Sequence, residues 1–421
     1  MLSKAIQTIR EGKKDQQGQV ILSGLEDILF HHIIDDFDLD LIDLTKECNT
    51  QSKDKAHKAQ ILREFIQQKK HLNTGISPTD ILQDIVHSIA YTLLYQDIFT
   101  RISKTMFKLG DTYSTSQKHV SEIIPIFFPL NGIFSLVTIP EQAYSCISEQ
   151  LNSPDLNPYW KDTLTLGWIY QFWNETSKKR IDDKVLKGGK VDNNEIASKT
   201  QLFTEQYMID WTLQNTLGRK WFSICERNDW TPEVVSNGTL QNLKDNQKIW
   251  REKRQNGEVP LGDFMPTKNV WEKHWVYYIP QSINPEEVLH VPDSIRDLKL
   301  LDPACGTGHF LVVAVDYFFE LYKEEERHRI QMGEIQPNDA HWTDASIVGR
   351  IISHNLYGLD IDSKAIQVAI AALFLKGKSK SNEVSPSHFN LVSSQLHIPN
   401  LCDQSILQFK NNVYHETGIS K

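Results

Sequence analysis

The chain has 421 residues, of which 40% are hydrophobic and 24% charged, so it is long enough for two or three domains of ordinary globular composition. Its formal net charge of -9 excludes recruitment of nucleic acid by bulk electrostatics, and any DNA contact therefore needs a local basic face. The five cysteines are scattered without a CxxC pair, which argues against a disulfide framework and a zinc site and is typical of a reducing cytoplasm.

Residues 1–175 are expected to form a helical region. In residues 76–102, apolar side chains recur at helical spacing after Ser77-Pro78-Thr79-Asp80, a sequence typical of a helix start. The opening residues, MLSKAIQTIREGKK, lack the apolar core of a signal peptide. Residues 123–140 are the most apolar stretch, but they hold three prolines and an asparagine. We therefore expect a buried irregular segment there and no membrane span.

A second helical block is expected at residues 155–175. Its aromatic side chains (Trp168, Tyr170, Phe172 and Trp173) suit either a nucleic-acid stacking surface or core packing, and packing is the favoured interpretation. A charged surface connection is expected to follow over residues 176–199. Its lysines, and those of KIWREKR at residues 248–254, are the two places where contact with a DNA backbone is plausible.

Residues 200–290 are expected to begin with a short extended entry and a helix, up to residue 223. Leu213 and Leu217 continue the apolar face of this helix, and Gly218 is expected to stop it. Residues 224–290 are loop-rich, contain five prolines and receive no assignment. Thus the organisation predicted before residue 291 is a helical region, a charged connection and a helix with an insertion.

Residues 291–421 change to an alternation of strands and helices. Strands are expected at 298–302 and 355–362, and helices at 308–326 and 363–377. This pattern predicts an α/β fold with a parallel sheet whose ligands lie at the carboxyl ends of the strands.

The turn between the first strand and helix, LLDPACGTGHF, indicates close approach of the backbone to a ligand. A phosphate-binding P-loop needs a lysine after the last glycine, and a dinucleotide fingerprint needs a third glycine where Leu311 stands. S-adenosylmethionine has no phosphate and carries an ammonium and a sulfonium. The acid at the strand end, Asp302, suits an ammonium and would repel a pyrophosphate, and Asp360 at the next strand end is placed to accept ribose hydroxyls.

Four short motifs carry a family resemblance. Residues 302–310, DPACGTGHF, resemble motif I of the adenine-specific DNA methyltransferases, and NLYGLDID at 355–362 resembles their motif II. NLCDQSIL at 400–407 resembles the end of their third strand. TQLFT at 200–204 resembles motif X, although the family usually has proline where this chain has Glu205.

The running order of these motifs is similar to that of the large adenine methyltransferases of BREX (phage growth limitation) defence systems, and partly to type IIG restriction-modification enzymes. The resemblance implies a helical N-terminal region followed by the first half of a Rossmann-like sheet that binds S-adenosylmethionine. It also implies a cytoplasmic enzyme that methylates N6 of adenine in double-stranded DNA. An RNA or protein methyltransferase is a less favoured alternative, because the cofactor half of the fold is shared.

The resemblance and the charge argument together give the candidate site residues. Asp302 is expected to contact the ammonium, Asp360 the ribose hydroxyls and Ile361 the adenine face. Asp403 is expected to take the adenine amino group, unless it is an ordinary surface acid. The alternative for Asp360 is a helix cap, which Asp362 or Ser363 can provide instead. Close backbone approach, or a cover over the site, is expected from a further group: Ala304, Gly306, Gly308, Phe203 and Thr204.

The family's catalytic Asn/Asp-Pro-Pro-Tyr/Phe motif is not found, and no catalytic residue is therefore assigned. The only Asn-Pro pairs, at Asn157 and Asn284, precede motif I and lack a second proline. The chain is expected to end before the catalytic strand and to be inactive alone, as a fragment, a split subunit completed by a partner, or a remnant. The alternative function is a non-catalytic scaffold that keeps the cofactor pocket within a defence complex.

Overall fold

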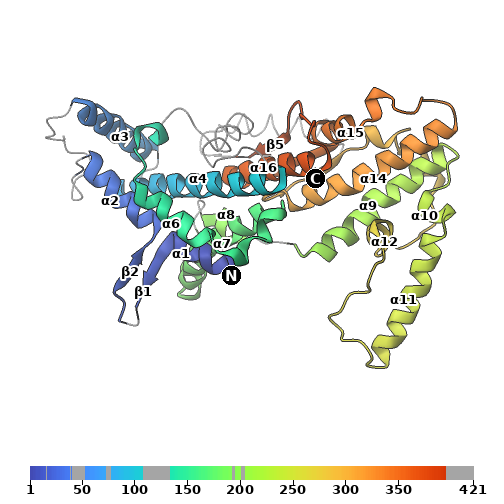
Figure 1. Ribbon diagram of the computed structural model, residues 1–421, viewed down its shortest axis with the longest axis horizontal. Helices are drawn as coiled ribbons and strands as arrows, with labels where there is room; N and C mark the ends of the chain where they lie inside the picture. The colour runs from blue at the N-terminus through green and yellow to red at the C-terminus, as the bar shows by residue number, and fades with distance from the viewer. Residues whose placement is uncertain are drawn as a thin grey trace, which may run out of the picture.

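The computed structural model describes residues 1–15, 17–37, 39, 53–72, 77–107, 133–191, 195–200 and 204–394. It combines many helices with a small parallel sheet (Figure 1). The candidate positions Phe203 and Asp403, and residues 123–132 of the apolar stretch, lie outside the described residues. Among the helices that are described, none combines the length and apolarity needed to cross a bilayer.

The N-terminal region is mainly helical, as predicted, and also holds a hairpin that the sequence pattern did not indicate. Its elements are α1 (Leu2–Glu11), β1 (Gly12–Lys14), β2 (Val20–Ser23), α2 (Leu25–Phe37), α3 (Lys53–Leu72) and α4 (Pro78–Phe107). The predicted start of α4 is confirmed, because Asp80 donates its backbone N–H to Ser77 Oγ at 3.1 Å and accepts the Ser77 hydroxyl at 2.7 Å.

The next elements lead to the long helix α7. They are η2 (Ile133–Leu136), α6 (Glu141–Leu151), η3 (Pro154–Leu156), η4 (Tyr159–Lys161), α7 (Thr165–Leu186) and α8 (Ile196–Thr200). Trp173 is fully buried and Tyr170 nearly so, so these two members of the aromatic block pack inside the molecule. Helix α7 continues into the segment expected to be a connection. The solvent-exposed end of this helix has no apolar periodicity. It is stabilised by ion pairs between neighbouring turns, such as Glu175–Lys179 at 2.8 Å.

The segment that received no assignment is also largely helical. It contains α9 (Gln206–Arg227), α10 (Glu233–Ser236), α11 (Thr239–Gln255), α12 (Val270–Trp275) and α13 (Pro285–His290). The predicted stop at Gly218 is wrong, because α9 runs through it. A Cβ at this position would lie 3.0 Å from the Trp275 ring, so the glycine serves close helix packing and does not end the helix.

The C-terminal described region contains the parallel sheet, in the strand order β3-β4-β5. Its elements are η6 (Ile295–Asp297), β3 (Leu300–Asp302), α14 (His309–Gln331), η7 (Ala340–Trp342), α15 (Asp344–Arg350), the π-helical turn η8 (Ile351–Asn355), β4 (Leu356–Asp360), α16 (Ser363–Lys380) and β5 (Asn390–Ser393). Both predicted strands and both predicted helices are confirmed with small shifts of their ends. The third strand, β5, lies before residues 400–407, which were expected to end such a strand and which lie outside the described residues.

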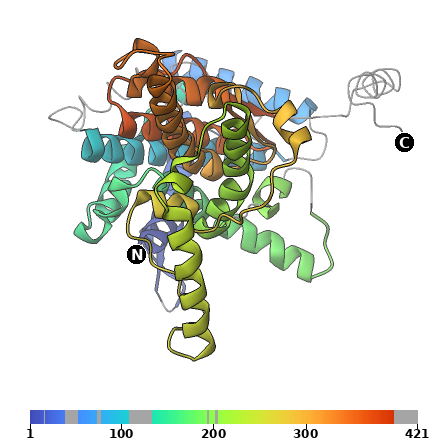
Figure 2. The ribbon, with the colours of Figure 1, turned by 90° about the vertical axis from the view of Figure 1, so that its right-hand side faces the viewer.

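The helical region packs directly against the sheet region. Helices α4 and α7 both contact α16, and Tyr91 of α4 donates its hydroxyl to the Lys364 backbone oxygen at 3.3 Å (Figure 1). At the other end of the molecule, α11 leaves the body as a projecting helix (Figure 2). The contact between α7 and α16 places helical-region side chains beside the carboxyl ends of the strands.

Candidate functional site

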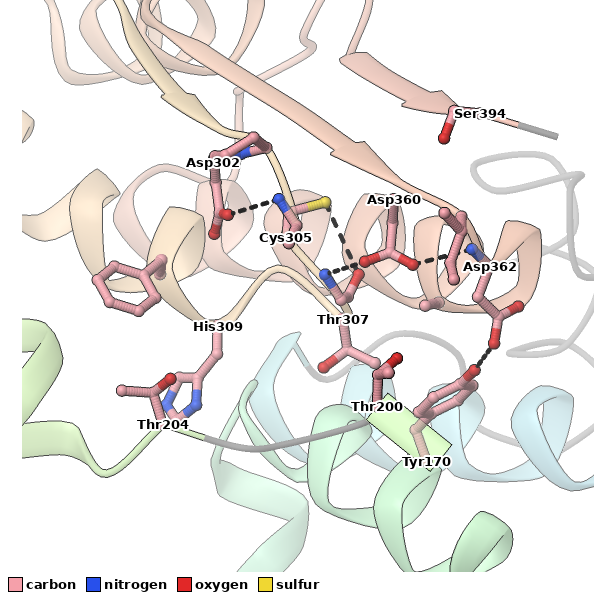
Figure 3. A pocket seen from close by; sticks show the side chains of 16 residues that line it. Tyr170, Thr200, Thr204, Asp302, Cys305, Thr307, His309, Asp360, Asp362 and Ser394 are labelled. Carbon is pink, nitrogen blue, oxygen red and sulfur yellow. Dashed lines mark hydrogen bonds between the residues drawn. The ribbon is translucent and has the colours of Figure 1, made fainter. Parts of the chain in front are cut away.

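A cavity of about 350 Å³ lies at the carboxyl ends of β3 and β4 (Figure 3). Its volume falls within the range of roughly 300–1,000 Å³ that small-molecule sites occupy. One wall is the turn from β3 to α14 with the end of β4, and the other comes from α7, α8 and the entry to α9. The lining residues are Tyr170, Thr200, Thr204, Asp302, Pro303, Ala304, Cys305, Gly306, Thr307, His309, Phe310, Asp360, Ile361, Asp362, Ala365 and Ser394.

The turn between β3 and α14 depends on two glycines for different reasons. Both have left-handed backbones, with φ of 53° at Gly306 and 79° at Gly308. A Cβ on Gly306 would meet nothing within 4 Å, so this position faces open space. A Cβ on Gly308 would lie 2.9 Å from the Ala369 Cβ, so this position allows α14 to pack closely on α16.

The Asp360 carboxylate holds this turn against the end of β4. It accepts the backbone N–H of Gly306 through Oδ2 and that of Asp362 through Oδ1, both at 2.8 Å. The cap of α16 is Asp362, which accepts the Lys364 N–H at 2.9 Å. The alternative role of Asp360 as the helix cap is therefore wrong, because Asp362 occupies the N-cap position of α16.

The charge of the site favours a cationic ligand. Three carboxylates (Asp302, Asp360 and Asp362) line the cavity, and no lysine or arginine does so among the described residues. Burial, and secondarily the charge of Asp360, raises the pKa of Asp302 above its ordinary value. Since the Gly306 N–H already serves Asp360, the turn does not offer this donor to a phosphate. The arrangement suits a ligand with a positive charge and hydroxyl donors.

The opposite wall brings in residues that the sequence interpretation did not assign to the site. Tyr170 of α7 donates its hydroxyl to Asp362 Oδ2, and burial, together with this carboxylate, raises the tyrosine pKa (Figure 3). On the wall of the glycine turn, His309 at the start of α14 also lines the cavity, and burial lowers its pKa. Cys305, in the same turn, is buried, and burial raises its thiol pKa to about 12.

The structure brings together six of the nine candidate residues. Asp302, Ala304, Gly306, Asp360, Ile361 and Thr204 line one cavity. Gly308 does not line it and contacts α16 instead. The remaining two, Phe203 and Asp403, lie outside the described residues. The aromatic block at residues 168–173 contains Tyr170, but the spacing of its aromatic residues does not distinguish a residue that lines a cavity from one that packs in the core.

Comparison with known proteins gives two kinds of match. Residues 280–406, which include β3, β4 and most of the cavity's acidic wall, match the family model of the MmeI DNA-methyltransferase domain. The chain is 24% identical to the adenine-specific methyltransferase PglX of Lacticaseibacillus casei (strain Zhang) over 242 residues, and 26% identical to the adenine-specific methyltransferase BrxX of Escherichia coli O9:H4 (strain HS) over 239 residues.

These matches cover 55% and 56% of this chain but only 16% and 15% of the two relatives. The chain thus matches about one sixth of the length of these proteins. The resemblance to the adenine-specific methyltransferases that the four motifs predicted is confirmed by both kinds of match.

Proposed function

We propose that this chain, a homologue of the adenine-specific methyltransferases PglX and BrxX, forms the S-adenosylmethionine-binding part of a DNA adenine N6-methyltransferase. In this proposal β3, β4 and β5 are the first half of a Rossmann-like sheet. In this proposal a motif X helix with its insertion occupies residues 200–290 and the cofactor-binding region begins at 291, as expected. The expected boundary at residue 175 falls inside α7, so the helical region extends to residue 186 before the connection.

The choice of cofactor rests on one observation. The glycine-containing turn after β3 resembles those of nucleotide sites, but the side chains around it are carboxylates and not phosphate-binding groups. Asp302 would hold the ammonium of S-adenosylmethionine, and Asp360 the ribose hydroxyls through the lone pairs that its two backbone bonds leave free. The Ile361 side chain, 48% exposed, would pack on the adenine ring. The bound cofactor would supply a methyl group on a cationic sulfur.

The opposite wall would close the site. Thr204 lines the cavity and would cover the cofactor together with Phe203, while Asp403 would receive the adenine amino group. Ala304 and Gly306 would allow close backbone approach, and Gly308 would set the packing of α14 on α16 that shapes the turn. The roles of the other residues follow the family resemblance, whereas that of Gly308 follows from its close approach to Ala369.

The substrate in this proposal is double-stranded DNA, and the chain would act in phage defence within the cytoplasm. The target adenine must leave the helix before its N6 can be reached. The 421 residues contain no Asn-Pro-Pro or Asp-Pro-Pro sequence. We therefore expect activation of the adenine amino group to come from another polypeptide segment, and the chain alone to bind cofactor without methylating DNA. The second candidate, a non-catalytic subunit that keeps the pocket as a scaffold, rests on the same missing motif.

Calorimetric titration of the 421-residue chain tests the cofactor assignment. We expect a single site for S-adenosylmethionine and no competition from ATP or NAD, because their phosphates would face the three carboxylates. Circular dichroism would verify that the protein is folded. A folded chain that binds ATP or NAD at this site, or that does not bind S-adenosylmethionine, would overturn the proposal.

A methylation assay with labelled cofactor tests the rest. The isolated chain is expected to give no N6-methyladenine on duplex DNA, and robust product would contradict this expectation. Product that appears only after a segment with the Asn-Pro-Pro-Tyr motif is added would favour a split enzyme over a scaffold.

A further inference from the structure

Helix α11 carries a row of cations that the proposed cofactor site does not use. Lys244, Lys248 and Arg251 are all exposed and follow one another at i, i+4 and i+7. At 100° per residue these positions lie within about 60° of one another around the helix axis. They form one stripe, which we call the α11 cation row.

No ion pair ties up the α11 cation row in the part of the chain that the structure describes. The acids on the same helix, Asp245 and Glu252, lie roughly 80–100° from Lys244 and roughly 40–60° from Lys248 around the helix axis, and neither forms an ion pair with the row in the described residues. In a chain of net charge -9, three adjacent unpaired cations are a local exception that a polyanion would recognise.

The helix is anchored at one end and free at the other. Leu240 and Leu243 are buried, and Gln247 donates its side-chain amide to the Val276 backbone oxygen at 2.6 Å. These contacts fix the first half of the helix, up to Gln247, on α10 and α12, while the second half projects from the body (Figure 2). The α11 cation row is therefore held on a defined helix and remains open to a large ligand.

The other basic segment singled out in the sequence is different. On α7 and α8, Lys179 pairs with Glu175 and Lys184 with Glu195, both at 2.8 Å, and Lys199 pairs with Asp182. These lysines are largely neutralised by their own neighbours, so the segment presents a mixed surface. The contrast favours α11 as the place where anions bind.

We propose that the α11 cation row binds consecutive phosphates of one DNA strand, outside the cofactor site. This inference rests on the proposed function for the identity of the polyanion. The row extends over about 10 Å of helix, and three consecutive phosphates of one strand extend over about 7 Å along the duplex axis, a difference that long Lys and Arg side chains can bridge. The contacts are to the backbone and carry no base sequence information.

The test is the salt dependence of binding to a fluorescein-labelled 20-base-pair duplex, followed by anisotropy. Each neutralised phosphate contributes about -0.9 to the slope of log affinity against log salt. The triple variant Lys244→Gln/Lys248→Gln/Arg251→Gln should therefore flatten the slope by about 2.7. Between 50 and 200 mM salt, the wild type should lose roughly 40-fold more affinity than the variant.

A charge-matched control is available on α7. The variant Lys179→Gln/Lys184→Gln/Lys199→Gln, which extends onto α8, removes the same number of cations and should change the slope by less than about one unit, because all three lysines are paired with carboxylates. Equal flattening in both triple variants, an unchanged slope in the α11 variant, or no duplex binding by the wild type at 50 mM salt would overturn the proposal. A poly-glutamate peptide of equal charge that binds the row as tightly as the duplex would also overturn it, in favour of an acidic protein partner.

Calorimetry with S-adenosylmethionine separates this inference from the proposed function. The α11 variant should bind the cofactor like the wild type, because the row lines no part of the cavity. Normal cofactor binding with an unchanged salt slope refutes the α11 cation row alone. Absence of cofactor binding in the folded wild type refutes the proposed function instead.

Discussion

Gly306 donates its backbone N–H to the Asp360 carboxylate across 54 positions of sequence, at 2.8 Å. The bond joins the turn after β3 to the end of β4, and so couples the two motifs from which the site was predicted. It also decides the electrostatics of the cavity. The glycine amide that would contact a phosphate in a nucleotide site is used to hold an acid, and this acid lines the cavity.

Substitution of Asp360 by Asn should weaken S-adenosylmethionine binding by at least about tenfold, and Asp360→Ala should abolish it. The neutral amide offers one acceptor oxygen where the carboxylate serves two N–H groups, and hydrogen bonds to charged groups contribute about 1.5–3 kcal/mol. Calorimetry measures the affinity, and Glu286→Gln on the exposed start of α13 is the matched control. Unchanged affinity in Asp360→Ala would reject the ribose-binding role.

The two glycines of the turn should respond differently to alanine. Gly308→Ala combines a left-handed φ with a Cβ 2.9 Å from Ala369, and it should lower the free energy of unfolding by about 2–4 kcal/mol. Gly306→Ala has only the backbone strain, about 1–2 kcal/mol, because its Cβ meets open space. Its methyl would project into the ligand's region, so its larger effect should be on cofactor affinity.

Urea denaturation and calorimetry on both glycine variants check this contrast. The expected result is that Gly308→Ala is the less stable protein and Gly306→Ala, once folded, the weaker binder. Equal losses of stability would show that the close approach to Ala369 relaxes without cost.

The sequence was sufficient for β3, β4, the turn after β3, and the acids Asp302 and Asp360, because each depends on local chemistry. Short apolar runs end in Asp302 and Asp360, and glycines mark the turn, so the carboxyl-end site followed from chain order alone. The stop at Gly218 failed because its purpose is contact with Trp275, a residue 57 positions away. The role of Tyr170 at the cavity was not predicted for the same reason, since its partner Asp362 is 192 positions distant. Long-range packing leaves no periodic signature.

Tyr170→Phe should weaken cofactor binding about threefold to tenfold while the protein stays folded. The phenyl ring keeps the packing against Tyr91, but the hydroxyl no longer holds Asp362 at the cavity wall. Loss of one hydrogen bond to a charged group costs about 1.5–3 kcal/mol at most, and part falls on stability. Tyr159→Phe, at a partly exposed ring elsewhere on the helical region, is the control. Equal affinities of the two variants would assign Tyr170 to packing only.

Cofactor affinity should fall on acidification, beginning at a higher pH than for an ordinary aspartate. Burial raises the pKa of Asp302 above 3.8, so the carboxylate that would hold the ammonium is protonated earlier as the pH falls. Bound ammonium favours the charged form, so binding near this pKa should release a proton. Calorimetry between pH 7 and pH 4.5, in buffers of different ionisation enthalpy, measures both effects.

The same raised pKa has the opposite consequence for stability. The folded state binds the Asp302 proton more tightly than the unfolded state, so the charged side chain lowers stability at neutral pH and this loss is recovered as the pH falls through the folded pKa. Asp302→Asn removes the buried charge. It should therefore shift the urea midpoint upward at pH 7, make it less dependent on acid, and weaken cofactor binding in the same protein. Asp302 accepts the Ala304 N–H at 3.1 Å within the turn. If Asp302→Asn loses stability at pH 7, this bond compensates the charge of the carboxylate, and the carboxylate is not a binding group for a cation.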